Sequence, residues 1–326
     1  MPHASPLFVA GDWGTSHLRL YLCRGRETLE QRDGPGIGAL QTSPETVLFE
    51  GIAPWIAAHG ALPVWLAGMV GSRNGWREAP YAACSADASR LIDAILRFDS
   101  NGHDIRIVPG MSCINSFGAP DVMRGEETQI IGAMALDPTL AGAGSRVLVL
   151  PGTHTKWVRV RDGYIDAFHT SLSGELYALL RDHSTLARAG RQRASGNALS
   201  DNPEAFEFGL ERARTLVEAT LSHVLFETRS RQLLTDMTPD EALAFLSGLI
   251  IGQDVRGALS LFDGALGAGH VVPVIGAPQL TELYRVALAA HGIQSHAVDA
   301  TDATVQGLCA LGDVARRSEV SHGVAS

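Results

Sequence analysis

Lysine is almost absent from this sequence. The 326 residues include 26 cationic side chains, and Lys156 is the single lysine among them. Lysine is a compact point charge, whereas arginine is a planar fork of donors. A lysine that persists against this bias is a candidate for a role that arginine cannot fill. The alternative, an ordinary solvated lysine, stays open until its neighbours are considered.

Other absences argue against several classes of protein. The net charge is −9 and no basic block stands out, so the chain lacks the basic footprint of nucleic-acid binding. The four cysteines are far apart and show no metal-ligand spacing, which predicts reduced thiols rather than a zinc site or a disulfide framework. No apolar run is long enough to span a membrane. The N-terminus lacks the cationic segment of a signal peptide, so we expect a cytoplasmic protein without a membrane partner.

What is present fits a globular α/β protein. Apolar residues make up 45% of the chain, and the length suggests about two domains. Short strand-like runs alternate with helical stretches, among them 43–59, 87–98 and 202–228. We expect two domains, residues 1–142 and 143–326, that meet at a cleft. Each should contain a mixed five-stranded sheet flanked by helices.

Both predicted domains begin with a strand, a Gly-Thr turn and a second strand. The turns contain Gly14, Thr15 and Ser16 in the first half and Gly152, Thr153, His154 and Thr155 in the second. Such turns expose N–H groups and hydroxyls to phosphate oxygens. Asp12 precedes the first turn and is placed to bind Mg²⁺, which prefers one or two carboxylates plus phosphate oxygens. Lys156 would add charge beside the second turn. The alternative is that these residues only build tight turns.

The two turns resemble the phosphate motifs of the sugar kinase, hexokinase and actin superfamily. Gly276-Ala277-Pro278 before a helix is similar to the adenosine motif of that superfamily. A more specific resemblance, to the 2-dehydro-3-deoxygalactonokinase family, comes from the segments 67–72, 74–76, 123–129, 151–157, 173–176 and 245–252. It covers most of the chain and implies two ribonuclease H-like domains.

The resemblance also implies an activity. It implies ATP-dependent phosphorylation of 2-dehydro-3-deoxy-D-galactonate at its 6-hydroxyl in D-galactonate breakdown, with ATP and Mg²⁺ as cofactors. ATP would then contact both turns together with Gly276 and Ala277. Two alternatives stay open: a kinase of another sugar acid or amino sugar, and a sugar-binding relative without catalysis. A homo-oligomer is compatible with either.

Similar sugar kinases place a carboxylate base at the start of a helix before the second phosphate motif, and segment 124–129 occupies that place. We favour Glu126 over Glu127 as the base, although acids at a helix start are also favoured by the helix dipole. With the base, the predicted catalytic residues are Glu126, Asp12 and Lys156. A substrate carboxylate favours an arginine partner, here Arg73 or Arg124. The predicted substrate contacts are Arg73, Asn74, Trp76, Arg124 and Glu127.

Overall fold

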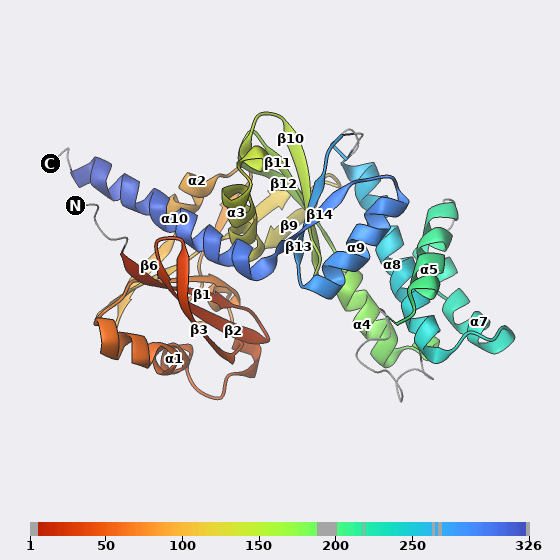
Figure 1. The fold of residues 1–326 in the computed structure, drawn as a ribbon, viewed down its shortest axis with the longest axis horizontal. Helices are drawn as coiled ribbons and strands as arrows, with labels where there is room; N and C mark the ends of the chain where they lie inside the picture. Colours follow the sequence, from red (N-terminus) through yellow and green to blue (C-terminus); the bar gives the residue numbers. More distant parts are fainter. Residues whose placement is uncertain are drawn as a thin grey trace. The chain divides into compact units, whose positions relative to one another are not determined.

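The structure is a computed structural model that describes residues 6–187, 201–216, 218, 220–262, 265–266 and 269–323. The chain divides into two compact units. Unit 1 comprises Met1–Gly144, Val160–Phe168 and Ala300–Ser326, and unit 2 comprises Ser145–Arg159 and His169–Asp299. This division differs from the predicted one in that residues 160–168 and the C-terminal helix belong to unit 1. Figure 1 labels the helices and strands of both units.

Unit 1 is built on a six-stranded mixed sheet. Its strands, in spatial order, are β3 (Glu27–Pro35), β2 (His17–Arg24), β1 (Leu7–Trp13), β4 (Val64–Gly68), β7 (His103–Ile107) and β6 (Leu96–Ser100). β1 runs antiparallel to β2 and parallel to β4. The residues that follow β1 and β4 therefore emerge at the same edge of the sheet.

The strand β6 (Leu96–Ser100) differs from the prediction in two respects. A helix was predicted over 87–98, but α2 (Ala88–Asp93) ends early and residues 96–98 lie in β6. β6 pairs antiparallel with β7, with Leu96 opposite Ile107. The helical prediction was wrong for this segment because β6 and β7 form a hairpin across Asn101 and Gly102, both of which have positive φ, and this pairing outweighs the local helical pattern. The same pairing gives this sheet six strands instead of five.

Two long helices cover opposite faces of the first sheet, as Figure 1 shows for α1 (Pro44–His59) and α10 (Ala300–Gly323). The helix predicted over 43–59 is thus confirmed. α1 buries Leu48, Ile52 and Trp55 against the sheet. Burial of such an apolar stripe supplies most of the stability of a helix like this one.

α10 packs directly on α3 (Glu126–Leu136), and glycines make this contact close. A Cβ atom on Gly132 would lie 1.7 Å from the carbonyl oxygen of Ala303. A Cβ atom on Gly307 would lie 2.0 Å from the carbonyl oxygen of Thr128. The two helix backbones therefore touch, and a side chain at either glycine would force them apart. This contact holds α3 in place.

A smaller three-stranded sheet completes unit 1. It contains β5 (Tyr81–Ala83), β8 (Gly110–Ile114) and β9 (Pro120–Met123), with β8 in the centre. Met111 and Met123 lie opposite each other on its buried face. β9 leads into the start of α3, so this sheet helps to position that end of the helix.

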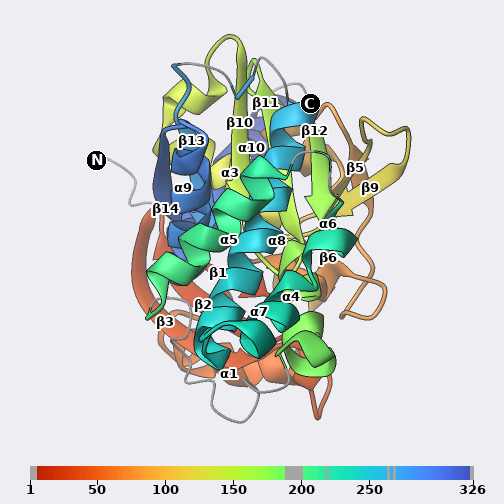
Figure 2. The same cartoon turned by 90° about the vertical axis from the view of Figure 1, so that its right-hand side faces the viewer.

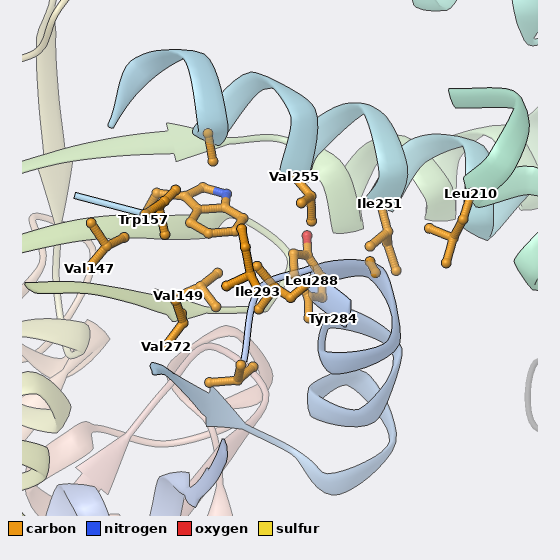
Figure 3. Packing of buried hydrophobic residues seen from close by; sticks show 14 of the residues in the cluster. Val147, Val149, Trp157, Leu210, Ile251, Val255, Val272, Tyr284, Leu288 and Ile293 are labelled. Atoms are coloured by element: carbon orange, nitrogen blue, oxygen red, sulfur yellow. The ribbon is translucent and has the colours of Figure 1, made fainter. Parts of the chain in front are cut away.

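A five-stranded sheet, as predicted for the second half of the chain, contains the strands of unit 2 together with residues 160–168, which are counted in unit 1. Its order is β12 (Tyr164–Ser171), β11 (Thr155–Arg161), β10 (Ser145–Leu150), β13 (Val272–Gly276) and β14 (Ser295–Asp299). The core of unit 2 forms where Val149, Trp157 and Tyr284 pack beneath a long helix (Figure 3). β13 runs parallel to both β10 and β14.

The helices of unit 2 are α4 (Ser173–His183), α5 (Pro203–Thr215), α6 (Leu221–Val224), α7 (Glu227–Leu234), α8 (Pro239–Leu261) and α9 (Pro278–Ala290). The helical stretch predicted over 202–228 is divided among α5, α6 and the start of α7, because α5 ends at Thr215. α5 and α8 lie side by side in Figure 2. A Cβ atom on Gly248 would lie 2.1 Å from the carbonyl oxygen of Phe206, so these two backbones also touch.

α8 is a long helix of mainly apolar composition. In the described part of the chain it is the one helix long and apolar enough to cross a membrane, but 72% of its most apolar window is buried inside the protein. A capping box between Thr238 and Glu241 fixes its start. Its burial is that of a core helix.

Candidate active site

The first predicted phosphate turn joins β1 to β2. The carbonyl oxygens of Gly14, Thr15 and Ser16 accept hydrogen bonds of 2.9–3.3 Å from the backbone amides of residues 36–38. Glycine is needed at position 36, because a Cβ atom there would lie 2.4 Å from the backbone of the turn. Thr15 and Ser16 are exposed. The turn is thus held in one shape from behind, while its hydroxyl side chains face outward.

Asp12 lies at the end of β1, beside this turn. Arg19 faces it across the β1–β2 ladder, with 3.4 Å between Nη1 of Arg19 and Oδ2 of Asp12. Burial raises the pKa of Asp12, the Arg19 guanidinium lowers it in part, and the Glu126 carboxylate raises it further. About a quarter of the side chain, 24%, stays exposed. Asp12 is therefore a carboxylate in a crowded, negatively charged place that a cation would stabilise.

Two glycines with positive φ bring Glu126 towards Asp12. Gly68 ends β4 with φ +93°, and a Cβ atom there would lie 2.9 Å from the carbonyl oxygen of Trp13. Gly125 precedes α3 with φ +108°, and its Cβ atom would lie 3.3 Å from the Cα atom of Gly68. Both conformations favour glycine. The start of α3 therefore abuts the ends of β1 and β4, which places Asp12 and Glu126 in one site.

The two adjacent glutamates at this helix start have different environments. Glu126 is half-buried, and its Oε2 accepts a hydrogen bond of 3.0 Å from the amide of Arg124. Glu127 is fully buried, and it accepts hydrogen bonds from the amide of Gly125 at 2.7 Å and the hydroxyl of Thr128 at 3.0 Å. The structure does not support Glu127 as a substrate contact, because its carboxyl group is covered by protein. Burial of this kind cannot be seen in two neighbouring letters of a sequence.

The burial of Glu127 predicts a dependence of stability on pH. Desolvation first, and then the nearby Glu126 charge, raise the pKa of Glu127 to about 8. Its neutral form is favoured only in the folded state, so its contribution is complete below pH 4.5 and is lost as pH rises through 8. The free energy of unfolding should therefore fall by up to about 5 kcal/mol across that range, and we expect Glu127→Gln to remove this fall. Urea unfolding at several pH values measures it, with exposed Glu207→Gln as the control. An unchanged pH dependence in E127Q would contradict this.

Arg124 sits between the small sheet and the glycine-rich loop that follows β4. Its Nη2 donates to the carbonyl oxygen of Ala79 at 2.9 Å, and its guanidinium lies 4.3 Å from the centre of the Tyr81 ring. Nε and Nη1 are buried and have no hydrogen-bond partner. Unpaired buried donors are costly, so an anionic group that reached them would be stabilised.

The other predicted substrate contacts lie in different surroundings. Arg73 is exposed and lies 3.6 Å from Glu78, measured from Nε to Oε1. Asn74 is exposed in the same loop. Trp76 packs edge-on against Phe98, with 5.1 Å between ring centres, and contributes to the core of unit 1. Arg124, unlike the exposed Arg73, lies beside Gly71 and the start of α3.

The second predicted turn, residues 152–154, joins β10 to β11 and lies against the start of α4. The amide of Glu175 donates to the carbonyl oxygen of Thr153 at 2.8 Å, and Nε2 of His154 lies 2.5 Å from Oε2 of Glu175. A Cβ atom on Gly174 would lie 2.2 Å from the carbonyl oxygen of Gly152. Gly152 itself has open space where a Cβ atom would lie. The turn is thus supported by α4 and open above Gly152.

A buried hydroxyl cluster lies behind this turn, and the sequence did not reveal it. The hydroxyls of Thr155, Ser173 and Tyr284 lie 2.8–3.0 Å from one another. The Tyr284 hydroxyl donates to Asp254 at 2.5 Å, and Nε1 of Trp157 donates to the other Asp254 oxygen at 2.9 Å. Burial raises the pKa of Asp254, and these donors offset it in part. Figure 3 shows Trp157 and Tyr284 in the core beneath α8.

Lys156 is not a surface lysine. It is 4% exposed, and its Nζ donates to the carbonyl oxygen of His154 at 3.1 Å. The ammonium group therefore lies beside the second turn, as its position in the sequence predicted. Its burial in the described structure excludes the interpretation of an ordinary solvated lysine.

The predicted adenosine turn follows β13. A Cβ atom on Gly276 would lie 3.4 Å from the carbonyl oxygen of Pro151, so this turn abuts the start of the second phosphate turn. Ala277 precedes α9 and accepts a hydrogen bond of 2.8 Å from the Thr281 hydroxyl. A cavity of about 60 Å³ lies nearby, lined in part by Gly152 and residues of α4, α8 and α9. That volume suits a few water molecules but not a purine, so the adenosine assignment stays a prediction.

The donor set around Asp12 fits magnesium better than metals that need a full protein cage. Among the residues that the structure describes, there is no group of three or more His, Cys, Asp or Glu side chains that could hold a metal ion. Mg²⁺ keeps waters and phosphate oxygens and needs only one or two carboxylates. Asp12, with the charge of Glu126 close by, meets that requirement.

Comparison with known proteins gives the family. A family model described as 2-keto-3-deoxy-galactonokinase matches residues 12–311. The chain belongs to this family. It is 36% identical over 308 residues to a "Probable 2-dehydro-3-deoxygalactonokinase" of Rhizobium meliloti (strain 1021), covering 93% of this chain and 95% of that protein. It is 37% identical over 293 residues to the 2-dehydro-3-deoxygalactonokinase of Escherichia coli (strain K12), covering 89% and 92% respectively.

Solved structures agree with the family in fold. A crystal structure of a protein from Sinorhizobium meliloti, described as a 2-dehydro-3-deoxygalactonokinase protein, superposes with a TM-score of 0.81 at 35% identity. The match covers 94% of this chain and 98% of that one. The activator of 2-hydroxyisocaproyl-CoA dehydratase from Clostridium difficile, with bound ADPNP, matches with a TM-score of 0.53 at 12% identity, covering 97% of each chain. The fold of the family is thus the actin-like ATPase and sugar kinase fold that the phosphate motifs predicted.

Proposed function

We propose that this chain phosphorylates 2-dehydro-3-deoxy-D-galactonate at its 6-hydroxyl, with ATP as the donor, and releases the 6-phosphate in D-galactonate breakdown. Membership of the family supports the activity. The observation that carries the mechanism is the meeting of Asp12 and Glu126 at the ends of β1 and β4, beside a phosphate-type turn. Phosphoryl transfer to a hydroxyl is served by a metal-organising carboxylate together with a second group that accepts the proton of, or orients, the attacking hydroxyl.

The test is a coupled assay of ATP consumption across a panel of 2-keto-3-deoxy sugar acids. Turnover with the galactonate derivative well above its epimers supports the proposal. Preference for another acid supports the first alternative, a kinase of a different sugar acid. Binding of sugar acid without ATP consumption supports the second, a non-catalytic relative.

In the proposed mechanism, Glu126 accepts the proton of the 6-hydroxyl as that oxygen attacks the terminal phosphorus of ATP. Its half-buried carboxylate is held by the amide of Arg124, which fixes its direction. Mg²⁺, when bound, neutralises charge on the phosphate oxygens, and Asp12 is the residue that would hold it. Arg124 anchors the substrate carboxylate at the other end of the six-carbon chain, with Arg73 as the alternative. One fixed end sets the register of an extended substrate.

Two glycine-containing turns form the proposed binding site for the nucleotide. The phosphates of ATP bind to both turns, the first formed by Gly14, Thr15 and Ser16 and the second by Gly152, Thr153, His154 and Thr155. The adenosine binds to Gly276 and Ala277. The exposed hydroxyls of the first turn and the open space above Gly152 in the second support this assignment. A nucleotide-bound structure, with contacts to each turn, is the direct test.

Lys156→Met is expected to weaken the use of ATP more than the use of the sugar acid. The ammonium group braces the second turn through the carbonyl oxygen of His154 and places its charge beside it. Steady-state kinetics with each substrate varied in turn should show a higher KM for ATP, by about tenfold, and a nearly constant KM for the sugar acid. Lys156→Arg is the charge-conserving control. Unchanged kinetics in K156M would remove this lysine from the mechanism.

We also propose a cytoplasmic enzyme whose partners are small molecules rather than nucleic acid or membrane. The small-molecule substrate follows from the kinase family, and the buried position of α8 fits this setting. A homo-oligomer stays a prediction, and light scattering of the purified protein measures it.

A further inference from the structure

The four cysteines of this chain form two couples. The thiols of Cys84 and Cys113 are close enough to interact, as are those of Cys23 and Cys309. All four are free thiols. Because the members of each couple are far apart in the sequence, the spacing of the cysteines gave no sign of either couple.

The strand register places Cys84 directly beside Cys113. β5 and β8 are parallel, and the last pair in their ladder is Ala83 with Ser112. The amide of Cys84 still donates to the carbonyl oxygen of Ser112 at 2.8 Å, so the next residues along the two chains are neighbours. Adjacent strands lie about 4.8 Å apart, within the Cα separation of about 4.4–6.8 Å that disulfides require. A bond between the two sulfurs therefore needs little movement of the backbone.

The two couples differ in access to solvent. Cys84 and Cys113 are half-buried, whereas Cys23 on β2 and Cys309 on α10 are fully buried. The interaction between the Cys84 and Cys113 thiols lowers the pKa of Cys113 and raises that of Cys84. The thiolate is the reactive form of cysteine. A thiolate on either sulfur can start the reaction, and the interaction with the Cys84 thiol favours it on Cys113.

We propose that Cys84 and Cys113 form a reversible disulfide when the protein meets a peroxide. The Cys113 thiolate attacks one peroxide oxygen and becomes a sulfenic acid, while the other oxygen leaves as water after protonation. The Cys84 sulfur then attacks the sulfenic sulfur, its proton and the sulfenic hydroxyl leave as a second water, and the S–S bond forms. Two thiols and one peroxide give one disulfide and two waters. Disulfides in the cytoplasm are typically transient and redox-sensing, which is the setting proposed for this enzyme.

The disulfide would act on the sugar-acid end of the site, and this part rests on the proposed function. β5 carries Tyr81, whose ring covers the Arg124 guanidinium, and Ala79 just before β5 accepts a hydrogen bond from Arg124. In the reduced form the Cys113 thiol also donates to the carbonyl oxygen of Phe168 at 3.3 Å, a bond that oxidation removes. Joining β5 to β8 restrains Tyr81 over Arg124 and hinders access to its unpaired donors.

The bond itself is tested by mass spectrometry of the full-length protein after treatment with hydrogen peroxide. We expect a loss of about 2 Da, a peptide containing Cys84 joined to one containing Cys113, and reversal by dithiothreitol. Cys23→Ser with Cys309→Ser is the matched control, and this double variant should still form the bond. Oxidation of Cys113 to a sulfinic acid without a bond, or bonding of Cys23 to Cys309 instead, would overturn the proposal.

The effect on the site is tested by kinetics of the reduced and oxidised enzyme. Oxidation should raise KM for the sugar acid by about threefold or more and leave KM for ATP unchanged, because small shifts of a positioning group are costly. Cys84→Ser should keep the reduced values in peroxide. A disulfide without a kinetic effect would overturn the link to Arg124. Absence of turnover with any sugar acid would instead count against the proposed function, since the mass measurement does not depend on activity.

Discussion

The Glu126→Gln enzyme is expected to lose about 10²-fold or more in kcat, with little change in KM for either substrate. Glutamine keeps the size of the side chain and its hydrogen bond from the amide of Arg124, but it cannot accept the proton of the attacking hydroxyl. Initial rates measured with saturating ATP and sugar acid give the comparison. The loss belongs in kcat because the proton moves only as the phosphoryl group is transferred.

The adjacent residue provides a matched control for this experiment. Glu127 is fully buried and its raised pKa keeps its carboxyl largely protonated at neutral pH, so Glu127→Gln replaces one neutral group by another. We expect E127Q to retain most of its activity near pH 7. If E127Q lost far more activity than E126Q, or if a bound substrate placed its 6-hydroxyl beyond about 4 Å from Glu126, the base would have to be reassigned. The kinase assignment would survive, because it rests on the family and on the two turns.

The Asp12→Asn enzyme is expected to be almost inactive. Asn keeps the shape of the side chain but loses the charge that organises Mg²⁺ at the phosphates, and several kcal/mol of such stabilisation correspond to a loss of about 10³-fold. kcat and kcat/KM should fall together, because the lost interaction is made mainly in the transition state. Isothermal titration with the sugar acid should show nearly unchanged affinity.

The control for Asp12 lies on the same sheet. Asp33 is exposed on β3 and faces Arg19 in the β2–β3 register, just as Asp12 faces it in the β1–β2 register. Asp33→Asn therefore removes a comparable charge near the same arginine without touching the site. It should stay close to wild type. Activity of D12N within about twofold of wild type would exclude Asp12 from the mechanism.

The parts of the site that the sequence predicted are those built from short segments. A Gly-Thr turn between two strands, or an acid before such a turn, has a local pattern that needs no distant partner to recognise. The family resemblance rested on the same kind of segment, and the family match confirms it. The position of Lys156 beside the second turn is likewise a matter of adjacency in the chain.

The rest depends on contacts between distant residues. The hydroxyl cluster joins Thr155 to Tyr284, which are 129 residues apart. The sequence around either residue does not predict this contact. Glu126 and Glu127 differ in burial, which depends on how α3 packs in the folded protein. These two features follow from tertiary packing, which overrides local preference. The strand β6 is a different case, because its partner β7 follows at once in a hairpin, and this pairing outweighs the local helical pattern.

The close backbone contact of α3 with α10 has a consequence for synthesis on the ribosome. Every other described element of unit 1 is translated before residue 169, but α10 begins at Ala300, after the whole of unit 2. Until α10 emerges, the glycine face of α3 around Gly132 has no helix to cover it, and the end of α3 that presents Glu126 lacks its support. The second unit is thus translated whole before α10, whereas the unit that holds Asp12 and Glu126 becomes complete only when the last helix has been made.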